Sequence, residues 1–511
     1  MNTLSVDGAG LTIADAEAIL RGRIGGLNLT PAARQRVETS RQCLEALAAT
    51  GATIYGVNTG FGKLSNQRIA AHEIIHLQEN LLRSHAVGMG NLLDRAVVRL
   101  ALALRIQALA KGFSGVTLDL VEHLIALFNH GVTPVIPEQG SVGASGDLAP
   151  LAHLALVAIG EGRAWLPLGE MLPGGDALAQ VDLKPYRLQA KEGLALINGT
   201  QISTAILADA LISARRLVQV ADVAGAMTVE ATKSSLRPFD ERIQAIRPHP
   251  GQVACAANLR RLLAHSQVME SHVGCNKVQD AYSMRCMPQV HGACRDALTH
   301  ITGVVEIEMN AATDNPLVFA AEQEVISGGN FHAQPIALCA DLLAAAVTDL
   351  SSIAERRVEN LVNPDLSGLP GFLTPHPGLN SGMMLVQVLA AALVSENKAS
   401  AFPASVDSIP TSANREDHVS MATAAARKAR TVVTNAVRVL ACELLCAAQG
   451  LEFHRPLQAG TGAEAAYRHI RASVAPLAAD RTLHPDLETV EGLIRSGSLL
   501  AAVEQACGPL A

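Results

Sequence analysis

The sequence predicts an all-α fold in which long helices form a bundle, beside a loop-rich region toward the N-terminus. Aromatic residues make up only 3% of the 511 residues, whereas β-strands draw heavily on aromatic and β-branched side chains. Alanine and leucine, which favour helices, recur throughout the chain. Apolar residues also fall at helical spacing over several stretches of roughly 20 residues or more. Helices that are long and apolar on more than one face are buried on most sides, as in a bundle.

Three regions are expected along the chain. Residues 1–200 mix short helices with glycine-rich and proline-rich loops, and loops of this kind often carry a functional site. Residues 201–450 hold the central bundle, with long helices expected at 201–232, 341–362, 383–402 and 418–449. Residues 451–511 are more polar and predict peripheral helices. A bundle of this composition leaves apolar helix faces for further copies of the chain, so an oligomer is expected.

Charge and cysteine usage argue against several classes of protein. The net charge is −7 and no basic block is present, which disfavours nucleic acid and membrane surfaces as partners. The nine cysteines include no CxxC pair, so we expect reduced thiols without a disulfide framework or a structural zinc. The N-terminal 20 residues carry acids where a signal peptide needs a basic start. Uncharged runs are shorter than the roughly 20 residues of a membrane span. A cytoplasmic protein is expected.

The segment with the most specific chemistry is GSVGASGDLAP at residues 140–150. Glycines at 143 and 146 permit a compressed turn that few φ/ψ combinations allow. In such a turn the amide nitrogen of Gly146 can attack the carbonyl carbon of Ala144, and the hydroxyl of Ser145 can leave as water. The product is a methylidene-imidazolone, an electrophile that no standard side chain supplies. The alternative is a glycine-rich turn that precedes a helix and binds an anion.

This segment, extended to GSVGASGDLAPLAHLAL, resembles the cofactor-forming segment of the histidine and aromatic amino acid ammonia-lyase family, and most closely its histidine-specific members. Further blocks that resemble the family run from YGVNTGFG at 55–62 to SVDSIPTSAN at 405–414. The resemblance implies the all-helical fold of the aspartase and fumarase lyases, and a homotetramer with shared active sites. It also implies a 4-methylidene-imidazol-5-one formed autocatalytically from Ala144, Ser145 and Gly146, without a metal or an added coenzyme.

Elimination of ammonia from an α-amino acid needs an electrophile for the amine, a base beside the β-carbon and a cation for the carboxylate. The resemblance implies that Tyr55 is the base, and its ordinary pKa near 10 requires a nearby positive charge or helix N-terminus for ionisation. Arg285 would hold the carboxylate through two parallel hydrogen bonds. Gln279, Tyr282 and Arg285 share a helix or tight-turn face, and the first two would position the amine and the ring. The alternative for Tyr55 is a loop tyrosine that only packs its ring. The alternative for Arg285 is an ion pair with Asp280 or Glu308.

Five further residues complete the implied site. Asn198 would orient the carboxylate and the cofactor carbonyl, and Phe331 would pack against the cofactor. Ser84 and His85 resemble the selectivity pair of the histidine-specific members, where tyrosine-specific members have His-Leu and phenylalanine-specific members have Phe-Leu. Glu416 would contact the imidazole or the leaving amine. The structural alternatives are an Asn-Gly turn for Asn198 and a core phenylalanine for Phe331. For His85 the alternative is a core histidine, and for Glu416 an acid at a helix start.

The resemblance predicts an ammonia-lyase of histidine metabolism that converts L-histidine to trans-urocanate. Three positions depart from the histidine-specific relatives, which carry glutamine where Met287 and Arg415 stand and an apolar residue where His291 stands. Because Arg415 lies next to Glu416, it can neutralise that carboxylate or meet an acidic group on another substrate. Modified histidine, tyrosine and phenylalanine therefore stay open as substrates, and so does a 2,3-aminomutase of the same family.

Three hypotheses come from other classes. HEIIH at residues 72–76 matches the HExxH helix motif of zinc hydrolases, although no third ligand is marked. Ser145 is also a candidate nucleophile for a serine hydrolase, but the GxSxG spacing and the strand-turn-helix context are absent. A catalytically silent relative used as a scaffold is the third hypothesis, and the presence of all the expected chemical residues argues against it.

Overall fold

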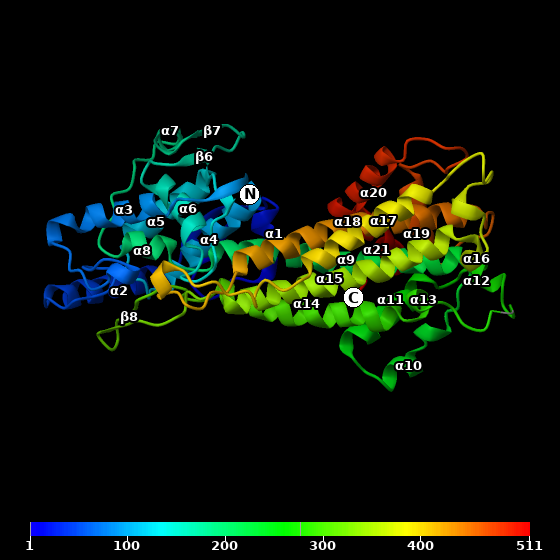
Figure 1. The fold of residues 1–511 in the computed structure, drawn as a ribbon, viewed down its shortest axis with the longest axis horizontal. Coiled ribbons are helices and arrows are strands. Elements are labelled where there is room, and N and C mark those ends of the chain that lie inside the picture. Colours follow the sequence, from blue (N-terminus) through cyan, green and yellow to red (C-terminus); the bar gives the residue numbers. More distant parts are fainter. Residues whose placement is uncertain (1, 276) are drawn as a thin grey trace. The chain divides into compact units, whose positions relative to one another are not determined.

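The computed structural model describes residues 2–275 and 277–511. Helices dominate both of the compact units into which the chain divides (Figure 1). The first unit consists of Met1–Ala210, Thr302–Asp341 and Pro403–Arg427, and the second of Leu211–Ile301, Leu342–Phe402 and Lys428–Ala511. The predicted all-α class is confirmed. The three-region organisation expected from composition stays a prediction.

Four of the five points of division fall within long helices: α9 (Gln201–Ala231), α14 (Met287–Met309), α15 (Gln334–Val362) and α18 (Ala422–Glu452). The fifth falls between residues 402 and 403, outside these helices. The observed bounds of the long helices, with α17 (Met384–Ser400), agree well with the predicted runs at 201–232, 383–402 and 418–449. Two differences stand out. Helix α15 begins at Gln334, seven residues before the predicted start at 341. The earlier start is possible because a proline in the first turn is compatible with a helix. Helix α14 is not among the predicted runs, because two glycines and several polar residues interrupt its apolar spacing.

The first unit contains all the strands among the described residues, together with helices of varied length. Its other helices are α1 (Ile13–Leu20), α2 (Pro31–Ala49), α3 (Ile74–His85), α4 (Arg95–Ala110), α5 (Leu118–Asn129), α6 (Leu148–Ala158), α7 (Gly174–Ala179) and α8 (Glu192–Ile197). The strands are β1 (Asn2–Val6), β2 (Ile24–Leu29), β3 (Met89–Leu92), β4 (Thr133–Pro134), β5 (Pro137–Gln139), β6 (Arg163–Trp165), β7 (Met171–Pro173), β8 (Leu317–Phe319) and β9 (Glu324–Ile326). They pair into four small sheets, β1–β2 parallel and β3–β5, β4–β6–β7 and β8–β9 antiparallel. Sheets this small depend on packing against helices for their stability.

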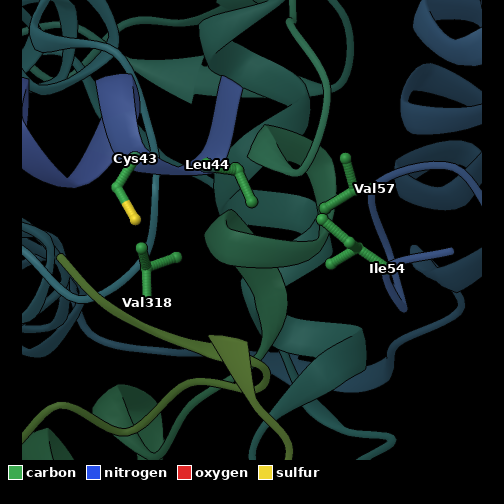
Figure 2. Close-up of a cluster of buried hydrophobic side chains, with 5 residues drawn as sticks. All are labelled: Cys43, Leu44, Ile54, Val57 and Val318. Carbon is green, nitrogen blue, oxygen red and sulfur yellow. The ribbon is translucent and has the colours of Figure 1, made fainter. Parts of the chain in front are cut away.

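A small hydrophobic cluster positions the loop that carries Tyr55. Figure 2 shows Cys43 and Leu44 of α2 with Val318 of β8 and with Ile54 and Val57, which flank Tyr55 in the chain. All five side chains of the cluster are buried, none more than 8% exposed. Burial of apolar side chains of this size stabilises by roughly 1.5–3 kcal/mol each. The cluster therefore anchors both sides of the tyrosine.

The second unit contains the remaining helices, α10 (Glu241–Ala245), α11 (Pro250–Leu262), α12 (Gln267–Glu270), α13 (Tyr282–Arg285), α16 (Pro364–Ser367), α19 (Thr461–Arg471), α20 (His484–Ser496) and α21 (Ser498–Cys507). A fully buried ion pair joins Arg357 of α15 to Glu443 of α18 through two hydrogen bonds of 2.6 and 2.9 Å. Both side chains are fully buried. A buried pair of this kind requires both partners, because one charge left alone is costly.

Helices α15 and α18 are long and apolar enough to cross a membrane by length and composition alone. The tested windows are, however, 61% and 83% buried inside the protein. Apolar helices whose side chains already pack against other parts of the chain are typical of a protein core. None of the nine cysteines forms a disulfide bond.

Candidate active site

Eight of the predicted site residues line two neighbouring cavities of the first unit. One cavity has a volume of about 590 Å³ and is lined by Ser84, His85 and Asn198 among others. The other has a volume of about 690 Å³ and is lined by Ala144 and Arg415 among others. The two share a set of residues that separates them: Tyr55, Gly62, Ser145, Asn315, Phe331, Ser412 and Glu416. Residues far apart in the chain thus converge around Ser145.

Glycine stands at two crowded positions of the turn at residues 143–147. Gly143 and Gly146 have φ values of +66° and +70°, a region that favours glycine. A Cβ at Gly143 would overlap the hydroxyl of Ser420, and a Cβ at Gly146 would overlap the carbonyl of Gly199. Ser420 also donates a hydrogen bond of 2.9 Å to the carbonyl of Gly143. The residues present therefore fit the predicted cofactor-forming segment, because only glycine can occupy both ends of this turn.

Asp147 anchors the end of the turn and is fully buried. Its carboxylate accepts hydrogen bonds from the hydroxyls of Ser141, Thr423 and Ser203 and from the backbone N–H of Ser203, at 2.7–3.0 Å. Burial raises the pKa of Asp147, and these hydrogen bonds partly offset the effect. The carboxylate thus joins the turn to two long helices, α9 and α18.

Ser145 donates a hydrogen bond of 2.7 Å from its hydroxyl to Glu416. The other carboxylate oxygen of Glu416 accepts hydrogen bonds from Thr411 and Ser412, at 2.6 and 2.8 Å. Burial acts to raise the pKa of Glu416, but hydrogen bonds from Thr411, Ser145 and Ser412 outweigh it and lower the pKa. Glu416 is therefore ionised at neutral pH. Sequence analysis did not identify the two hydroxyls at 411 and 412, although both lie in the family block that precedes Glu416.

Tyr55 is half-buried, and its hydroxyl oxygen accepts a hydrogen bond of 3.3 Å from the backbone N–H of Gly62. Its ring contacts Phe61 edge to face, with centroids 6.4 Å apart. Burial raises the pKa of Tyr55, and the negative charge of Glu416 raises it further. No cation among the described residues lowers this pKa; Lys63 lines one cavity and Arg415 the other.

Ser84 and His85 lie at the C-terminal end of α3. The Nδ1 atom of His85 lies 2.8 Å from the carbonyl oxygen of Leu81. A carbonyl oxygen only accepts, so Nδ1 carries the proton and Nε2 is an acceptor in the neutral ring. Burial lowers the pKa of His85, which favours this neutral form. The selectivity pair therefore offers the cavity a hydroxyl and an unprotonated imidazole nitrogen.

Asn198 and Phe331 complete the part of the site that the first unit supplies. Asn198 is 3% exposed, and its Nδ2 donates to the Oδ1 of Asp314 at 3.2 Å and to the carbonyl of Asn315 at 3.1 Å. Its Oδ1 has no hydrogen-bond partner among the described residues. Phe331 is half-buried and lines both cavities. Both residues thus line a cavity, and their predicted roles stay predictions.

Gln279, Tyr282 and Arg285 belong to the second unit and are not among the residues that line either cavity. Tyr282 and Arg285 occupy the one-turn helix α13, with the guanidinium carbon 4.5 Å from the centre of the Tyr282 ring. Tyr282 is 70% exposed. Gln279 is exposed and lies before the helix begins. Of the three residues expected to share a face, only Tyr282 and Arg285 therefore lie on the same helical turn.

Two of the three departures from the histidine-specific relatives lie in the interior of the second unit. Met287 and His291 are both fully buried. His291 contributes to a group of ligand-type side chains with Asp222 and Cys255, whose atoms lie within 4.8 Å of one another. Burial acts to raise the pKa of Asp222, but Arg295 and His291 outweigh it and lower the pKa to about 2. A guanidinium therefore already balances this carboxylate. Of the three departures, only Arg415 lines a cavity.

The HExxH motif does not have the geometry of a zinc site. His72 lies in a 3-10 turn (Ala71–Glu73), whereas His76 lies in α3, which begins at Ile74. The zinc motif needs both histidines on one regular helix, one turn apart. Both histidines are exposed. The hypothesis of a serine hydrolase also loses support, because the hydroxyl of Ser145 bonds to a carboxylate rather than to a histidine.

Comparisons with known proteins agree with the geometry. A sequence profile of a family described as aromatic amino acid lyase matches residues 11–472. The chain is 54% identical to histidine ammonia-lyase of Symbiobacterium thermophilum, over 98% of this chain and 99% of that protein. Among solved structures, histidine ammonia-lyase from Trypanosoma cruzi superposes with a TM-score of 0.92 at 42% identity, over 99% and 96% of the two chains. Tyrosine aminomutase from Streptomyces globisporus superposes with a TM-score of 0.94 at 36% identity, over 100% of each chain. The predicted resemblance is confirmed, and this chain belongs to the aromatic amino acid lyase family of carbon–nitrogen lyases.

Proposed function

We propose that this protein is an ammonia-lyase that converts L-histidine to trans-urocanate and ammonia. The observation that carries the proposal is the contact of Ser145 with Glu416 at the wall of a cavity that Ser84 and His85 also line. It joins the cofactor-forming turn to the residues expected to select histidine. The relatives named histidine ammonia-lyase support the same substrate, at 54% identity over nearly the whole chain.

The prosthetic group is proposed to form from Ala144, Ser145 and Gly146, without a metal or an added coenzyme. The overlap that a Cβ at Gly146 would make supports this, since the turn has the required crowding. When formed, the group supplies an electrophile that makes the substrate amine a better leaving group. Phe331 and Asn198 line the same cavity and would hold the group in place.

The side chains of this chain would move the protons and orient the substrate. Tyr55 would accept the β-proton at its hydroxyl oxygen, as the phenolate. Glu416 is ionised, so it would accept hydrogen bonds from the imidazole N–H or from the leaving ammonium. His85 offers an unprotonated Nε2, which would accept a hydrogen bond from the protonated nitrogen of the substrate ring. A phenyl ring has no donor to satisfy these two acceptors, and unsatisfied buried acceptors are costly.

The remaining parts of the site are proposed to come from other copies of the chain, in a cytoplasmic homotetramer with shared active sites. Tyr282 is 70% exposed and Arg285 is half-buried on the same helical turn. Both would reach the cavity of a neighbouring subunit, where Arg285 would hold the carboxylate. Exposed apolar side chains on the long helices support an oligomer, because patches of this kind mark interfaces. They include Ile307, Leu338, Leu342, Leu385, Val388 and Leu389.

A second candidate is an aminomutase, or an ammonia-lyase of tyrosine, phenylalanine or a modified histidine. Two observations favour it: the fold is shared with a tyrosine aminomutase, and Arg415 lines the cavity beside Glu416. The experiment is incubation of the purified protein with histidine, N-methylhistidines, tyrosine and phenylalanine in parallel. Absorbance detects each unsaturated acid, and chromatography detects β-amino acids. We expect urocanate to form fastest, whereas a preference for any other product would refute the proposal.

A further inference from the structure

Arg105 of α4 is a fully buried arginine. It contacts the Asn198–Gly199 turn, which pairs with Gly146 of the predicted cofactor-forming segment. Its Nη1 donates to the carbonyl of Asn198 at 2.9 Å and to the Oε1 of Gln201 at 3.1 Å. Its Nε and Nη2 have no hydrogen-bond partner among the described residues. Burial lowers the pKa of Arg105 to about 10, so the guanidinium still carries its charge at neutral pH.

Arg105 has no ion-pair partner among the described residues. The carboxylate that interacts with it, Asp314, already forms a hydrogen bond of 2.8 Å with Lys191, and both side chains of that pair are fully buried. The guanidinium therefore donates only to a backbone carbonyl and to an amide oxygen. Burial of an unpaired charge is costly, and apolar side chains of similar volume usually stabilise an interior better. A costly cation kept beside a candidate site indicates a role in that site.

A continuous series of close contacts leads from Arg105 to the cyclising turn. A Cβ at Gly199 would lie 2.6 Å from the Nη1 of Arg105. On its other side, the carbonyl of Gly199 accepts a hydrogen bond of 2.7 Å from the N–H of Asp147. Gly146 pairs with Gly199 as an isolated bridge, and a Cβ at Gly146 would overlap the same carbonyl. The guanidinium, the Gly199 peptide and Gly146 are thus stacked without room for a methyl group between them.

We propose that Arg105 is a positioning residue for cofactor formation, which holds the Asn198–Gly199 turn against Gly146 and so keeps residues 144–146 in the conformation that cyclises. The inference rests on the proposed function. In the step it assists, the nitrogen of Gly146 bonds to the carbonyl carbon of Ala144. The carbonyl oxygen leaves as water with the amide protons of Gly146 and Ser145. A second water forms from the hydroxyl and the Cα proton of Ser145. No oxidant is needed.

The geometry separates this role from ordinary packing. A lysine at position 105 keeps the charge but has a shorter reach and a compact amino group in place of the planar guanidinium. A methionine keeps most of the volume and loses both the charge and the donors. Gly199→Ala keeps Arg105 but places a methyl group between the guanidinium and the turn. All three changes should loosen the hold on Gly146, whereas a purely structural arginine predicts only a change in stability.

The test is the intact mass of the full-length protein after purification of the folded fraction, with circular dichroism to confirm helicity. We expect the wild type to lack the mass of two waters in all of its chains. In Arg105→Lys, Arg105→Met and Gly199→Ala a large part of the folded chains should keep the encoded mass. Because the charge-assisted hydrogen bonds are lost, ring formation should slow about tenfold or more, so the dehydrated fraction should rise with incubation time.

The matched control is Arg357→Met, which removes a fully buried arginine of the second unit. It should lower the melting temperature and still lose two waters completely. Full dehydration of the folded Arg105 variants would overturn the inference, and so would incomplete dehydration of Arg357→Met, because instability alone would then explain the effect. If Arg105→Met does not fold, Arg105→Lys and Gly199→Ala decide the question. An encoded mass for the wild type would refute the proposed function instead.

Discussion

Ser145 and Glu416 are 271 positions apart in the chain, yet the hydroxyl of the serine donates a hydrogen bond of 2.7 Å to the carboxylate of the glutamate. Thr411 and Ser412 hold the other carboxylate oxygen. Under the proposed function, the hydroxyl of Ser145 leaves when the prosthetic group forms. The carboxylate oxygen that bound it then becomes available to a substrate in the same cavity. One glutamate thus connects the formation of the site with its use.

Replacement of Glu416 by glutamine should reduce kcat on histidine by roughly 10²–10⁴-fold, the range for loss of a charged group that assists proton transfer. Glutamine keeps the size of the side chain but cannot hold a negative charge. The measurement is steady-state formation of urocanate, with intact mass as the control for a formed prosthetic group. Activity within a few-fold of the wild type, with the two waters lost, would remove Glu416 from the proposed chemistry.

The rate should rise with pH through the alkaline range, because burial and Glu416 raise the pKa of Tyr55. The base acts as the phenolate, and below its pKa the phenolate fraction grows about tenfold per pH unit. In Tyr55→Phe the alkaline rise should disappear and kcat should fall by roughly 10²–10⁴-fold. The measurement is kcat/KM for histidine against pH in both proteins. Parallel pH profiles would show that another group is the base.

The selectivity pair gives a prediction about substrate preference. His85→Leu removes the Nε2 acceptor from the cavity and should reduce kcat/KM for histidine by roughly 100-fold, because the protonated ring nitrogen loses its partner. The double variant Ser84→His with His85→Leu carries the pair of the tyrosine-specific members, and its preference should move toward tyrosine. The measurement is the ratio of kcat/KM for the two amino acids. An unchanged ratio would place selectivity elsewhere, with Arg415 the next residue to test.

Shared active sites predict complementation between two inactive variants. Ser145→Ala lacks the prosthetic group and Arg285→Met lacks the proposed carboxylate clamp, so each should be inactive alone. After the two are unfolded together and refolded, mixed tetramers should contain some sites with both residues intact. Activity should therefore reappear, and light scattering should report a tetramer. A mixture that forms tetramers and stays as inactive as its parents would show that each site is built from one chain.

Glu230 of α9 gives a stability prediction that is independent of catalysis. Burial raises its pKa from the ordinary value of 4.5 to about 7, although Ser266 and the N–H of Gly460 donate to it. The folded state therefore holds this proton more tightly than the unfolded state, and stability falls as pH rises from about 4.5 to about 7. At about 1.4 kcal/mol per pKa unit, the loss is at most about 4 kcal/mol.

In Glu230→Gln that part of the pH dependence should vanish, so the variant should melt higher than the wild type at pH 8. Glu241→Gln, a change at an exposed glutamate of the same unit, should leave the profile as it is. The measurement is the melting temperature between pH 5 and pH 8. A wild-type profile retained in Glu230→Gln would mean that Glu230 is ionised throughout this range.

The helices were predictable where apolar spacing continues without interruption, as in α9, α17 and α18. Helix α14 was not, because Gly292 and Gly303 weaken its periodicity, and its burial depends on packing partners that the local sequence does not reveal. The start of α15 was also missed, since the proline at its second position is equally compatible with a loop.

The site divides in the same way. Local motifs singled out Tyr55, Ala144, Ser145 and Glu416, and these four residues line the cavities. The hydroxyls of Thr411 and Ser412 that keep Glu416 ionised, and the guanidinium of Arg105 behind Gly199, act through contacts across space. A buried arginine in an apolar helix has no signal in a single sequence that separates it from a surface residue.

The most direct test of the central claim is the intact mass of the purified wild-type protein, beside Ser145→Ala as the reference that cannot eliminate the serine hydroxyl. We expect the wild type to fall short of its encoded mass by two water molecules. Peptide mapping should place that loss within residues 140–150, the segment that closes on itself around Ser145. Ser145→Ala has no hydroxyl at position 145, so it should not lose the second water. A wild-type protein at its full encoded mass, folded and still active on histidine, would contradict the claim.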